Sequence, residues 1–330
     1  MKFLKNKIIM ITGGTGSFGQ MCTKLLLEQD VKKIIIYSRD ELKQFEMSNK
    51  FTSPKLRFLL GDVRDLDRLK LATKQVDIII HTAALKQVPA AEYNPMESIK
   101  TNIYGAENVI SASIENNVKK IIALSTDKAA NPVNLYGATK LCADKLFINA
   151  NNLSRGSDIR FSVVRYGNVV GSRGSVFPYF KSLIQKNAKS LPITDERMTR
   201  FWITLDHGVK FVLNSIEMMQ GGELFIPKTP SIKITDLVKT LGENIKYHIV
   251  GIRPGEKLHE VLCPGDSARD TIEFKDYYVI RPSGEYSKNK AASYQINNKN
   301  EKGRFVKENF VYSSNTNSHF LSIKDLKKIV

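Results

Sequence analysis

Cysteine is scarce in this chain of 330 residues. The three cysteines, Cys22, Cys142 and Cys263, are far apart and form no CxxC pair, and the first two fall within helical patterns. Disulfide frameworks need organised pairs of cysteines and are typical of small secreted domains. We therefore expect three reduced thiols that are buried as small apolar side chains, in a cytoplasmic protein.

Metal-binding and membrane-spanning patterns are also missing. The five histidines show no HxxxH or similar spacing, so we expect no bound metal. No apolar run reaches the roughly 20 residues that a transmembrane helix needs. Residues 1–7 lead directly into a short apolar strand, unlike a secretory signal. These absences predict a soluble globular protein without a membrane span.

Acidic side chains are in the minority. The chain has 50 Lys and Arg against 33 Asp and Glu, which gives a formal net charge of +17. A nucleic-acid-binding protein concentrates such charge in a patch or an arm. Here the positive residues are dispersed in pairs, such as Lys32 with Lys33, and no zinc finger or Arg-rich arm is present. We expect a basic enzyme with anionic ligands and no nucleic acid partner.

The first half of the chain is rich in short apolar runs that alternate with helical patterns. Such alternation predicts parallel βαβ units with right-handed crossovers, and hence a Rossmann-type, doubly wound α/β sheet. Ligands of these sheets bind beyond the carboxyl ends of the strands. We predict strands at 8–11, 33–37, 56–60, 77–81, 120–125 and 161–165, and helices at 18–28, 40–49, 65–74, 95–116 and 135–150.

After Arg165 the pattern becomes irregular. We expect residues 1–165 to form the dinucleotide-binding domain and residues 166–330 to form mainly a smaller C-terminal substrate-binding domain, with some segments returning to the first. Helices are predicted at 176–186, 207–219 and 234–242, and a polar loop at 287–304.

A glycine-rich turn, TGGTGSFG at residues 12–19, joins the first predicted strand to the first predicted helix. Glycine lets the backbone turn sharply and approach a pyrophosphate, and the helix N-terminus adds amide donors and a favourable dipole. In this strand–turn–helix context the motif predicts dinucleotide binding. The expected cofactor contacts are Gly13, Thr15, Gly16, Ser17, Phe18 and Gly19.

The end of the second predicted strand bears on the choice between NAD and NADP. NAD sites have a carboxylate there for the ribose hydroxyls, whereas this chain has Ser38 and Arg39, with Lys43 one turn onward. A guanidinium matches a 2′-phosphate, so the sequence favours NADP. We expect cofactor contacts from Ser38, Arg39, Asp40 and Lys43. The alternative is that Arg39 is an ordinary surface residue and that Asp40 caps the following helix.

Two further strand ends are expected to contact the cofactor. Asp62 and Val63 follow the third predicted strand, where adenine would lie. Ala83 and Ala84 follow the fourth, and their small side chains allow close approach to the cofactor, although helix–strand packing would favour them too.

A YxxxK motif follows the fifth predicted strand. The strand ends at Ser125 and Thr126, and Tyr136 and Lys140 then lie four positions apart on a predicted helix. Residues at this spacing share a helix face, and a nearby ammonium favours tyrosinate. A phenolate can take a proton from a sugar hydroxyl while hydride leaves for the cofactor. We predict that Thr126, Tyr136 and Lys140 are catalytic.

Together, the glycine-rich turn, the strand end and the YxxxK motif resemble the extended short-chain dehydrogenases. This family uses NAD(P) to oxidise nucleotide sugars transiently and includes epimerases, dehydratases and reductases. Residues 126–140, TDKAANPVNLYGATK, are similar to a narrower group, the inverting UDP-N-acetylglucosamine 4,6-dehydratases that open pseudaminic acid synthesis. The similarity covers about residues 5–282 and includes the segments 38–43, 165–175, 198–202 and 253–257.

The resemblance implies UDP-N-acetylglucosamine as substrate, NADP as cofactor and a homo-oligomer. It implies neutral Lys128 as the base at C5 and protonated Asp127 as the acid at O6, with pKa shifts that burial would supply. The alternative for these two residues is a salt-bridged loop. Further cofactor contacts are expected from Lys86, Asn102, Asn168 and Val169, and substrate contacts from Lys86, Asn168, Val176, Phe177, Pro178, Thr194, Arg253 and Glu256.

Other functions stay open at this point. A C4 or C5 epimerase would share the cofactor site but would not need Asp127 and Lys128 to expel the C6 hydroxyl. A C5-retaining dehydratase would differ only in the face of the sugar that Lys128 reaches. A non-catalytic dinucleotide-binding regulator would often lack the tyrosine or the lysine, and both Tyr136 and Lys140 are present. Larger membrane-anchored relatives usually lack the tyrosine.

Overall fold

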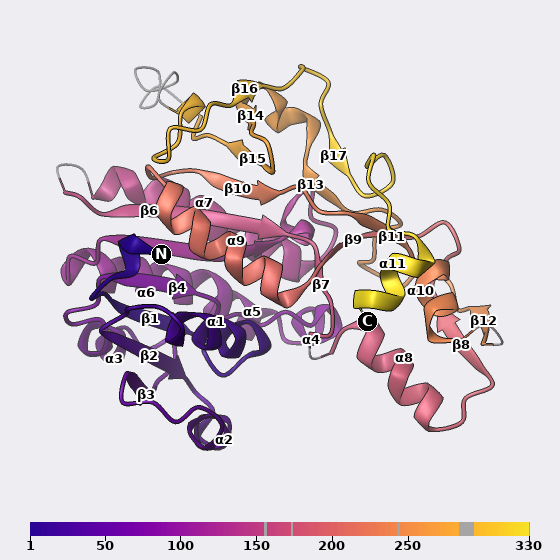
Figure 1. Ribbon diagram of the computed structural model, residues 1–330, viewed down its shortest axis with the longest axis horizontal. Helices are drawn as coiled ribbons and strands as arrows, with labels where there is room; N and C mark the ends of the chain where they lie inside the picture. Colours follow the sequence, from indigo (N-terminus) through magenta and orange to yellow (C-terminus); the bar gives the residue numbers. More distant parts are fainter. Residues whose placement is uncertain (155–156, 173, 243–244, 284–293, 330) are drawn as a thin grey trace.

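A ten-stranded sheet forms the centre of the computed structural model, which describes residues 1–154, 157–172, 174–242, 245–283 and 294–329. The strand order is β16-β14-β15-β10-β6-β5-β4-β1-β2-β3 (Figure 1). All neighbours from β10 to β3 run parallel, as predicted, and β15, β14 and β16 are antiparallel. The strands are β1 Ile8–Thr12, β2 Lys33–Ser38, β3 Leu56–Leu60, β4 Ile78–His81, β5 Lys120–Thr126, β6 Arg160–Tyr166, β10 Leu224–Pro227, β14 Thr271–Glu273, β15 Tyr277–Ile280 and β16 Arg304–Phe305.

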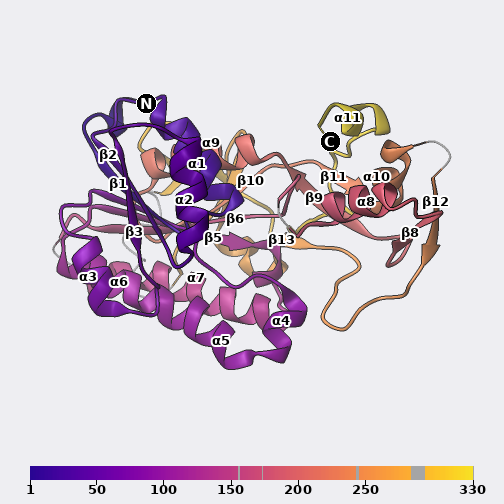
Figure 2. The ribbon, with the colours of Figure 1, turned by 90° about the horizontal axis from the view of Figure 1, so that it is seen from below.

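Helices cover both faces of this sheet, which gives the predicted doubly wound fold. In Figure 2, α1 and α9 lie on one side of the sheet, and α3, α6 and α7 lie on the other. Successive residues of a strand point to opposite faces, so Ile9 and Ile11 pack in the core with α1 and α9, and Ile8 and Met10 in the core with α6 and α7. The helices are α1 Ser17–Leu27, α2 Glu41–Lys50, α3 Leu66–Ala72, α6 Gly105–Glu115, α7 Leu135–Leu153 and α9 Leu205–Met218.

The helix predicted over residues 95–116 is interrupted. It begins as α5 Pro95–Ile99, widens into a π-helical turn, η2 Lys100–Tyr104, and continues as α6. Apolar periodicity does not distinguish an α-helical from a π-helical turn, so the sequence did not predict the interruption. The short helix α4 Val88–Tyr93 was not predicted either.

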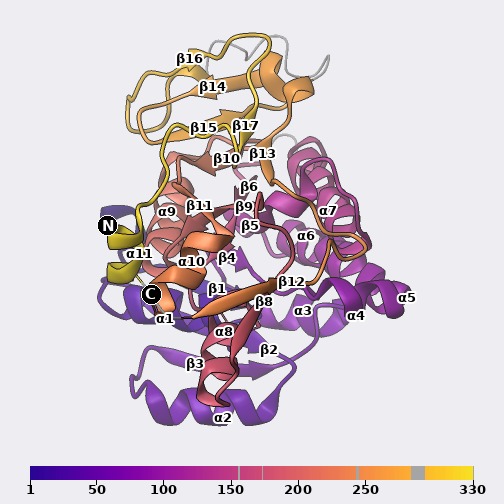
Figure 3. The same ribbon diagram turned by 90° about the vertical axis from the view of Figure 1, so that its right-hand side faces the viewer.

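A smaller group of elements, here called the small lobe, follows β6 and lies at the right of Figure 1. Figure 3 shows it from the front, with α8, α10 and α11 around short strands. Its own core contains Phe180, Trp202 and Leu237. It consists of β7 Asn168–Val169, α8 Val176–Gln185, β8 Ser190–Ile193, β9 Thr199–Ile203, β11 Ser231–Lys233, α10 Ile234–Leu241, β12 Lys246–Ile249 and α11 Ile323–Ile329.

Parts of the second half of the chain return to the large sheet. β10 pairs with the edge of β6, β15 and β14 continue the sheet beyond it, and α9 packs against α1. Two further strands, β13 Val261–Cys263 and β17 Tyr312–Ser313, pair with each other. The assignment of residues 1–165 to cofactor binding and of 166–330 to substrate binding stays a prediction.

The polar stretch 287–304 was predicted to be a loop. Residues 287–293 lie outside the described part of the chain. The described remainder is mostly turns with one isolated bridge between Ile296 and Lys302, and Arg304 begins β16.

The cysteines follow the prediction in part. Cys22 and Cys263 are buried, whereas Cys142 is exposed, because it lies on the outer side of α7 while the neighbouring Ala143 packs against the sheet. Within the described residues, no helix is both long and apolar enough to span a membrane.

Candidate active site

A cavity of about 940 Å³, here called the active-site cavity, lies where the carboxyl ends of β1, β4, β5 and β6 face the small lobe. Parallel sheets present this edge to their ligands. Most of the predicted site residues line it, although they come from segments far apart in the sequence. They are Gly13, Gly16, Ser17, Phe18, Ala83, Ala84, Lys86, Thr126, Asp127, Lys128, Tyr136, Lys140, Asn168, Val169, Val176, Thr194, Arg253 and Glu256.

The glycine-rich turn forms one wall of the cavity. Gly13 has a φ of +64°, and a Cβ there would lie 2.8 Å from Ala83 Cα, so only glycine fits. A Cβ on Gly19 would overlap the carbonyl of Gly14, so the first turn of α1 packs directly on the glycine turn. The backbone is thus open to a pyrophosphate at the N-terminus of α1, which fits a bound dinucleotide. Thr15 and Gly19 lie behind this wall and do not line the cavity.

The charged residues predicted to select the cofactor lie outside the cavity lining, at the end of β2. Arg39 is half exposed, and its Nη1 lies 3.5 Å from Asp62 Oδ2. Partial burial raises the pKa of Asp62, but the hydrogen bonds of Arg64 and the charge of Arg39 outweigh it and hold the pKa below its ordinary value. Asp40 caps α2, because its Oδ1 accepts a hydrogen bond of 3.0 Å from the backbone N of Lys43, and it also pairs with the Lys43 ammonium.

Three other predicted cofactor residues contact mainly the protein. Ser38 Oγ accepts a hydrogen bond of 3.1 Å from Gln44 Nε2, and Val63 is buried. Asn102, in the π-helical turn, accepts from the backbone N of Leu85 at 2.8 Å and donates to its carbonyl at 2.9 Å. Asn102 therefore fixes the segment after β4 that includes Ala83, Ala84 and Lys86. Direct contacts of Ser38, Val63 and Asn102 with a cofactor stay predictions.

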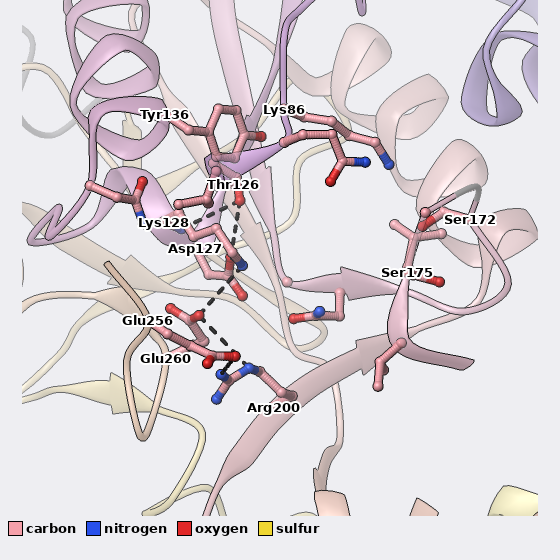
Figure 4. Close-up of a pocket in the computed structure, with 18 of the residues that line it drawn as sticks. Lys86, Thr126, Asp127, Lys128, Tyr136, Ser172, Ser175, Arg200, Glu256 and Glu260 are labelled. Atoms are coloured by element: carbon pink, nitrogen blue, oxygen red, sulfur yellow. Dashed lines mark hydrogen bonds and ion pairs between the residues drawn. The ribbon is translucent and has the colours of Figure 1, made fainter. Parts of the chain in front are cut away.

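Four predicted catalytic residues, Thr126, Asp127, Lys128 and Tyr136, converge beyond the end of β5 (Figure 4), and Lys140 lines the same cavity. β5 ends at Thr126, and the chain turns through a short 3-10 helix, η3 Asp127–Ala129. Thr126 Oγ1 donates to Asp127 Oδ1 at 2.9 Å, and Lys128 Nζ lies 3.0 Å from the same oxygen. The Asp127 carboxylate is buried, and its Oδ2 has no hydrogen-bond partner among the described residues.

Helix α7 places Tyr136 and Lys140 in the cavity. A Cβ on Gly137 would overlap the carbonyl of Lys128, so α7 and η3 are in direct contact. Burial raises the pKa of Tyr136 to about 12, although the charge of Lys128 and a hydrogen bond with Thr126 act in the opposite direction. This balance favours the protonated phenol, and a phenolate that takes a proton from the sugar stays a prediction. Burial also lowers the pKa of Lys140.

Lys128 lies between two carboxylates. Its Nζ is 3.0 Å from Asp127 Oδ1 and 3.4 Å from Glu260 Oε1. Burial alone lowers the pKa of Lys128, but the two carboxylates outweigh it and raise the pKa above its ordinary value. The prediction that burial makes this lysine neutral was wrong for this structure, because the charge of Asp127, and then that of Glu260 from a distant segment, outweigh burial. The interpretation of Asp127 and Lys128 as an ion pair describes their contact correctly, but both also line the cavity.

Two residues that were not predicted complete this cluster, Glu260 and Arg200. Arg200 Nε lies 3.8 Å from Glu260 Oε1, and its Nη atoms donate to three backbone carbonyls. Lys257, also not predicted, donates to the carbonyl of Ala130 at 2.6 Å. Arg200 falls in the segment 198–202 that resembles the dehydratases, which was a usable signal, whereas no motif marks Glu260.

The small lobe forms the opposite wall. Asn168 Oδ1 and Ser175 Oγ are buried without a hydrogen-bond partner among the described residues. Asn168 was predicted as a site residue, and Ser175 was not. Val176 lines the cavity, but Phe177 and Pro178 do not, and Phe177 is buried in the core of the small lobe. Arg173 of the same segment lies outside the described residues.

The residues expected to bind the nucleotide lie together. Thr194 Oγ1 donates to Glu256 Oε2 at 3.2 Å, and the backbone N of Arg253 donates to the same oxygen at 3.4 Å. Glu256 Oε1 lies 3.7 Å from Arg200 Nη2, so this group adjoins the Lys128 cluster. Among the described residues, no group of His, Cys, Asp and Glu is arranged to hold a metal ion.

Three features meet at one cavity of a doubly wound sheet: a glycine turn that is open to a pyrophosphate, a helix with the YxxxK motif, and a threonine at a neighbouring strand end. Together they define a dinucleotide-binding enzyme of the extended short-chain dehydrogenase class. Residues 9–282 match the family model described as polysaccharide biosynthesis protein. The chain therefore belongs to this family.

Individual relatives agree with the resemblance drawn from the motifs. A protein of Campylobacter jejuni named UDP-N-acetylglucosamine 4,6-dehydratase (inverting) is 60% identical over 325 residues, which are 98% of this chain and 97% of the relative. A protein of Rickettsia canadensis named UDP-glucose 4-epimerase is 43% identical over 287 residues, 84% of each chain. The crystal structure of Pen from Bacillus thuringiensis superposes with a TM-score of 0.88 at 36% identity and covers 99% of this chain and 97% of Pen.

Proposed function

We propose that this protein is a UDP-N-acetylglucosamine 4,6-dehydratase that inverts C5 and uses bound NADP, giving UDP-2-acetamido-2,6-dideoxy-L-arabino-hexos-4-ulose. The observation that supports it most is the position of Asp127 and Lys128 in the same cavity as Tyr136 and Lys140. Reversible oxidation at C4 needs only the tyrosine, the lysine and Thr126. Removal of water also needs an acid and a base, and Asp127 and Lys128 beside them can supply both. The relative from Campylobacter jejuni, similar over nearly the whole chain, supports the same activity.

The first chemical step is oxidation at C4. When bound, NADP supplies the hydride acceptor for C4 and later the hydride donor for C6. Tyr136 takes the proton of the C4 hydroxyl, which Thr126 orients. Because burial holds the phenol protonated, Tyr136 depends on nearby positive charge to act as a base, and Lys140 lies one helical turn away on the same face of α7.

The second step is loss of water across C5 and C6. The 4-ketone acidifies the C5 hydrogen, Lys128 removes it as a neutral amine and passes it to Asp127, and Asp127 then protonates the leaving C6 hydroxyl. The electron pair of the C5–H bond forms the C5–C6 double bond as the C6–O bond breaks. The proton that Tyr136 took from C4 offsets the one that is later delivered to C5. Delivery of a proton to the opposite face of C5 gives inversion.

The nucleotide half of the substrate fits the other wall of the cavity. The guanidinium of Arg253 suits a phosphate or ribose oxygen, and Glu256, which Thr194 orients, suits the ribose hydroxyls. Asn168 Oδ1, buried without a partner among the described residues, supports a role on the sugar or cofactor. Val176 at the start of α8 adjoins the diphosphate in this proposal.

NADP is proposed over NAD because Arg39, and no carboxylate, follows the last residue of β2. The guanidinium is half in solvent and makes only a long contact with Asp62, so a 2′-phosphate can reach it. Equilibrium titration of the purified protein with each cofactor tests this choice. Tighter binding of NADP supports it, and tighter binding of NAD would assign the other cofactor.

Proton NMR of the protein with UDP-N-acetylglucosamine in deuterated water tests the activity. A C6 methyl group and a 4-keto sugar with deuterium at C5 are expected, and the ring couplings report whether C5 is inverted. Retention at C5 would contradict the inverting assignment alone. An unchanged spectrum from folded protein loaded with NADP would contradict the dehydratase.

A C4 epimerase is the second candidate, since the relative from Rickettsia canadensis is named UDP-glucose 4-epimerase. The same spectra separate the two activities. An epimerase returns a sugar that keeps its C6 hydroxyl and has the opposite configuration at C4, without deuterium at C5.

The proposal also extends to the setting of the enzyme. It implies the first step of pseudaminic acid synthesis in the cytoplasm, carried out by a homo-oligomer. Light scattering of the purified protein tests the oligomer, and a mass equal to the monomer would contradict it.

A further inference from the structure

Glu260 is buried in the wall of the active-site cavity, and the reaction described above does not use it. Its side chain is only 3% exposed, and its Oε1 lies 3.4 Å from Lys128 Nζ and 3.8 Å from Arg200 Nε. Its Oε2 is buried without a hydrogen-bond partner among the described residues. A buried carboxylate oxygen that lacks a donor is costly, so it calls for an explanation in the working cycle.

Charged groups from three segments face this carboxylate. They are Asp127 and Lys128 of η3, Arg200 of β9, and Lys257 of the segment that includes Glu260 itself. Burial and the negative charge of Asp127 raise the pKa of Glu260, against the opposite effect of the three cations. Two carboxylates thus share one lysine, an arrangement in which a proton is readily exchanged within the cluster.

Lys128 cannot remove the C5 proton while it is an ammonium. Its side chain is 26% exposed toward the cavity, so water stabilises the charged pair that it forms with Glu260. A substrate that fills the cavity displaces this water. In these drier surroundings the neutral amine and the neutral carboxylic acid become more stable relative to the ion pair, because loss of water destabilises both charges.

On the basis of the dehydratase activity proposed above, we propose that Glu260 accepts a proton from Lys128 during the reaction and later returns it. When the sugar fills the cavity, a proton moves from Lys128 Nζ to the Glu260 carboxylate, so that an N–H bond breaks and an O–H bond forms. The neutral amine then takes the C5 proton of the 4-keto sugar, and the C–H electron pair moves into the C5–C6 double bond. Lys128 passes the C5 proton to Asp127 Oδ1, 3.0 Å away, and Asp127 delivers it to the departing C6 hydroxyl. Glu260 then returns its own proton to Lys128 Nζ, which restores the ion pair.

The fold holds Glu260 in place for this exchange. Arg200 is fixed by carbonyls of Thr199, Lys257 and Leu258 and fixes Glu260 in turn. The segment that leads to Glu260 is tied to the catalytic turn, because Lys257 donates to the carbonyl of Ala130. It is also tied to the start of α7, because Asn134 Nδ2 donates to the carbonyl of Gly255 at 2.7 Å.

The variant Glu260→Gln tests the proposal, since the amide keeps the shape but cannot accept the proton. We expect the KM for UDP-N-acetylglucosamine to change little and kcat to fall by roughly 10²-fold or more. Reduced nicotinamide is expected to accumulate transiently, because oxidation at C4 precedes the blocked step. In the variant Lys128 must lose its proton to solvent, so its rate is expected to rise with pH by about tenfold per unit, while the rate of the wild type stays flat over the same range.

Two further variants complete the kinetic test. Glu260→Asp keeps a carboxylate and is expected to retain part of the activity. Glu273→Gln is the matched control, because it removes a carboxylate that pairs with Lys228 at 2.8 Å outside the cavity, and its activity is expected to be unchanged. Wild-type kinetics in Glu260→Gln, or an equal loss at every pH, would overturn the proton exchange.

A readout that needs no turnover separates this inference from the proposed activity. Carbon NMR of lysine labelled at Cε, with Lys128→Ala for assignment, reports the charge of Lys128 in the protein loaded with NADP. UDP-xylose, which lacks C6 and cannot lose water, serves as the probe. The wild type is expected to show a neutral amine when this probe is bound, and Glu260→Gln an ammonium. An ammonium in both proteins would refute the exchange, whereas an inactive wild type that gives the expected signals would count only against the dehydratase.

Discussion

At the scale of single residues, the pKa of each side chain in the site depends on the balance between burial and neighbouring groups. Burial lowers the pKa of Lys128, but the charges of Asp127 and Glu260 outweigh it and raise the pKa above its ordinary value. Tyr136 shows the opposite balance, since burial raises its pKa and outweighs the charge of Lys128 and the hydrogen bond with Thr126. Both residues proposed as bases therefore favour their protonated forms in this structure.

Lys128→Ala is expected to leave NADP binding intact and to abolish dehydration. The variant removes the only lysine assigned to C5, while Tyr136 and Lys140 still oxidise C4. Deuterium incorporation at C5 and the absorbance of reduced nicotinamide measure the two steps separately. Lys228→Ala, which removes a lysine outside the cavity, is the matched control. A fully active Lys128→Ala enzyme would exclude this residue as the base.

The sequence could identify those site residues whose position follows from the local chain. Thr126, Asp127 and Lys128 directly follow an apolar strand, and Tyr136 and Lys140 share a helix face, so a parallel sheet brings them to one edge. Glu260 reaches Lys128, and Arg200 reaches Glu260, only through packing of distant segments. No local pattern encodes these contacts. The charge of Lys128 was mispredicted because the charge of the adjacent Asp127 outweighs burial and Glu260 adds to it.

At the scale of elements, the start of α7 is tied to the segment that we propose binds the nucleotide. The Asn134 side chain accepts a hydrogen bond of 2.8 Å from the backbone N of Gly137 and donates one of 2.7 Å to the carbonyl of Gly255. One side chain thus caps the helix of Tyr136 and Lys140 and anchors the segment that includes Arg253 and Glu256.

Asn134→Ala is expected to lower the free energy of unfolding by about 1 kcal/mol, because the helix loses its cap. It is also expected to raise the KM for the UDP-sugar, because the nucleotide-side segment is released. Asn134→Asp keeps the cap but cannot donate to Gly255, so it should raise the KM without the loss of stability. Urea unfolding and steady-state kinetics measure the two effects. A wild-type KM in both variants would disprove the link.

Elements of the first half of the chain were predictable because each strand is a continuous apolar run between helical patterns. β1 and β2, for example, begin and end within one residue of their predicted bounds. The π-helical turn at Lys100–Tyr104 was not predictable, since its buried residues, Thr101 and Asn102, continue the helical spacing of the buried residues on either side. β14 and β16 are two or three residues long and are defined by pairing with distant strands, so the local sequence does not reveal them.

At the scale of the whole molecule, a buried histidine links stability to pH. His81 ends β4, and its Nδ1 lies 2.8 Å from Thr12 Oγ1. Burial, together with the charge of Lys140, lowers its pKa to about 3, against about 6.5 in an unfolded chain. Below about pH 6.5 the unfolded state therefore binds a proton that the folded state does not, and stability falls as the pH falls.

His81→Asn is expected to weaken this acid sensitivity. Between about pH 6.5 and pH 5 the wild type should lose up to about 1.4 kcal/mol per pH unit through His81, and the variant should lack this contribution. Urea unfolding at several pH values measures the two slopes. Parallel slopes would show that His81 does not contribute.

The late position of β10 in the chain affects how the protein is made. β6 ends at Tyr166, but its free edge is covered only by β10, Leu224–Pro227, after the small lobe has begun to form. A nascent chain leaving the ribosome thus displays an unpaired, apolar strand edge for the time needed to synthesise that stretch. Yield in a cell should then depend on whether a chaperone shields this edge before another nascent chain pairs with it.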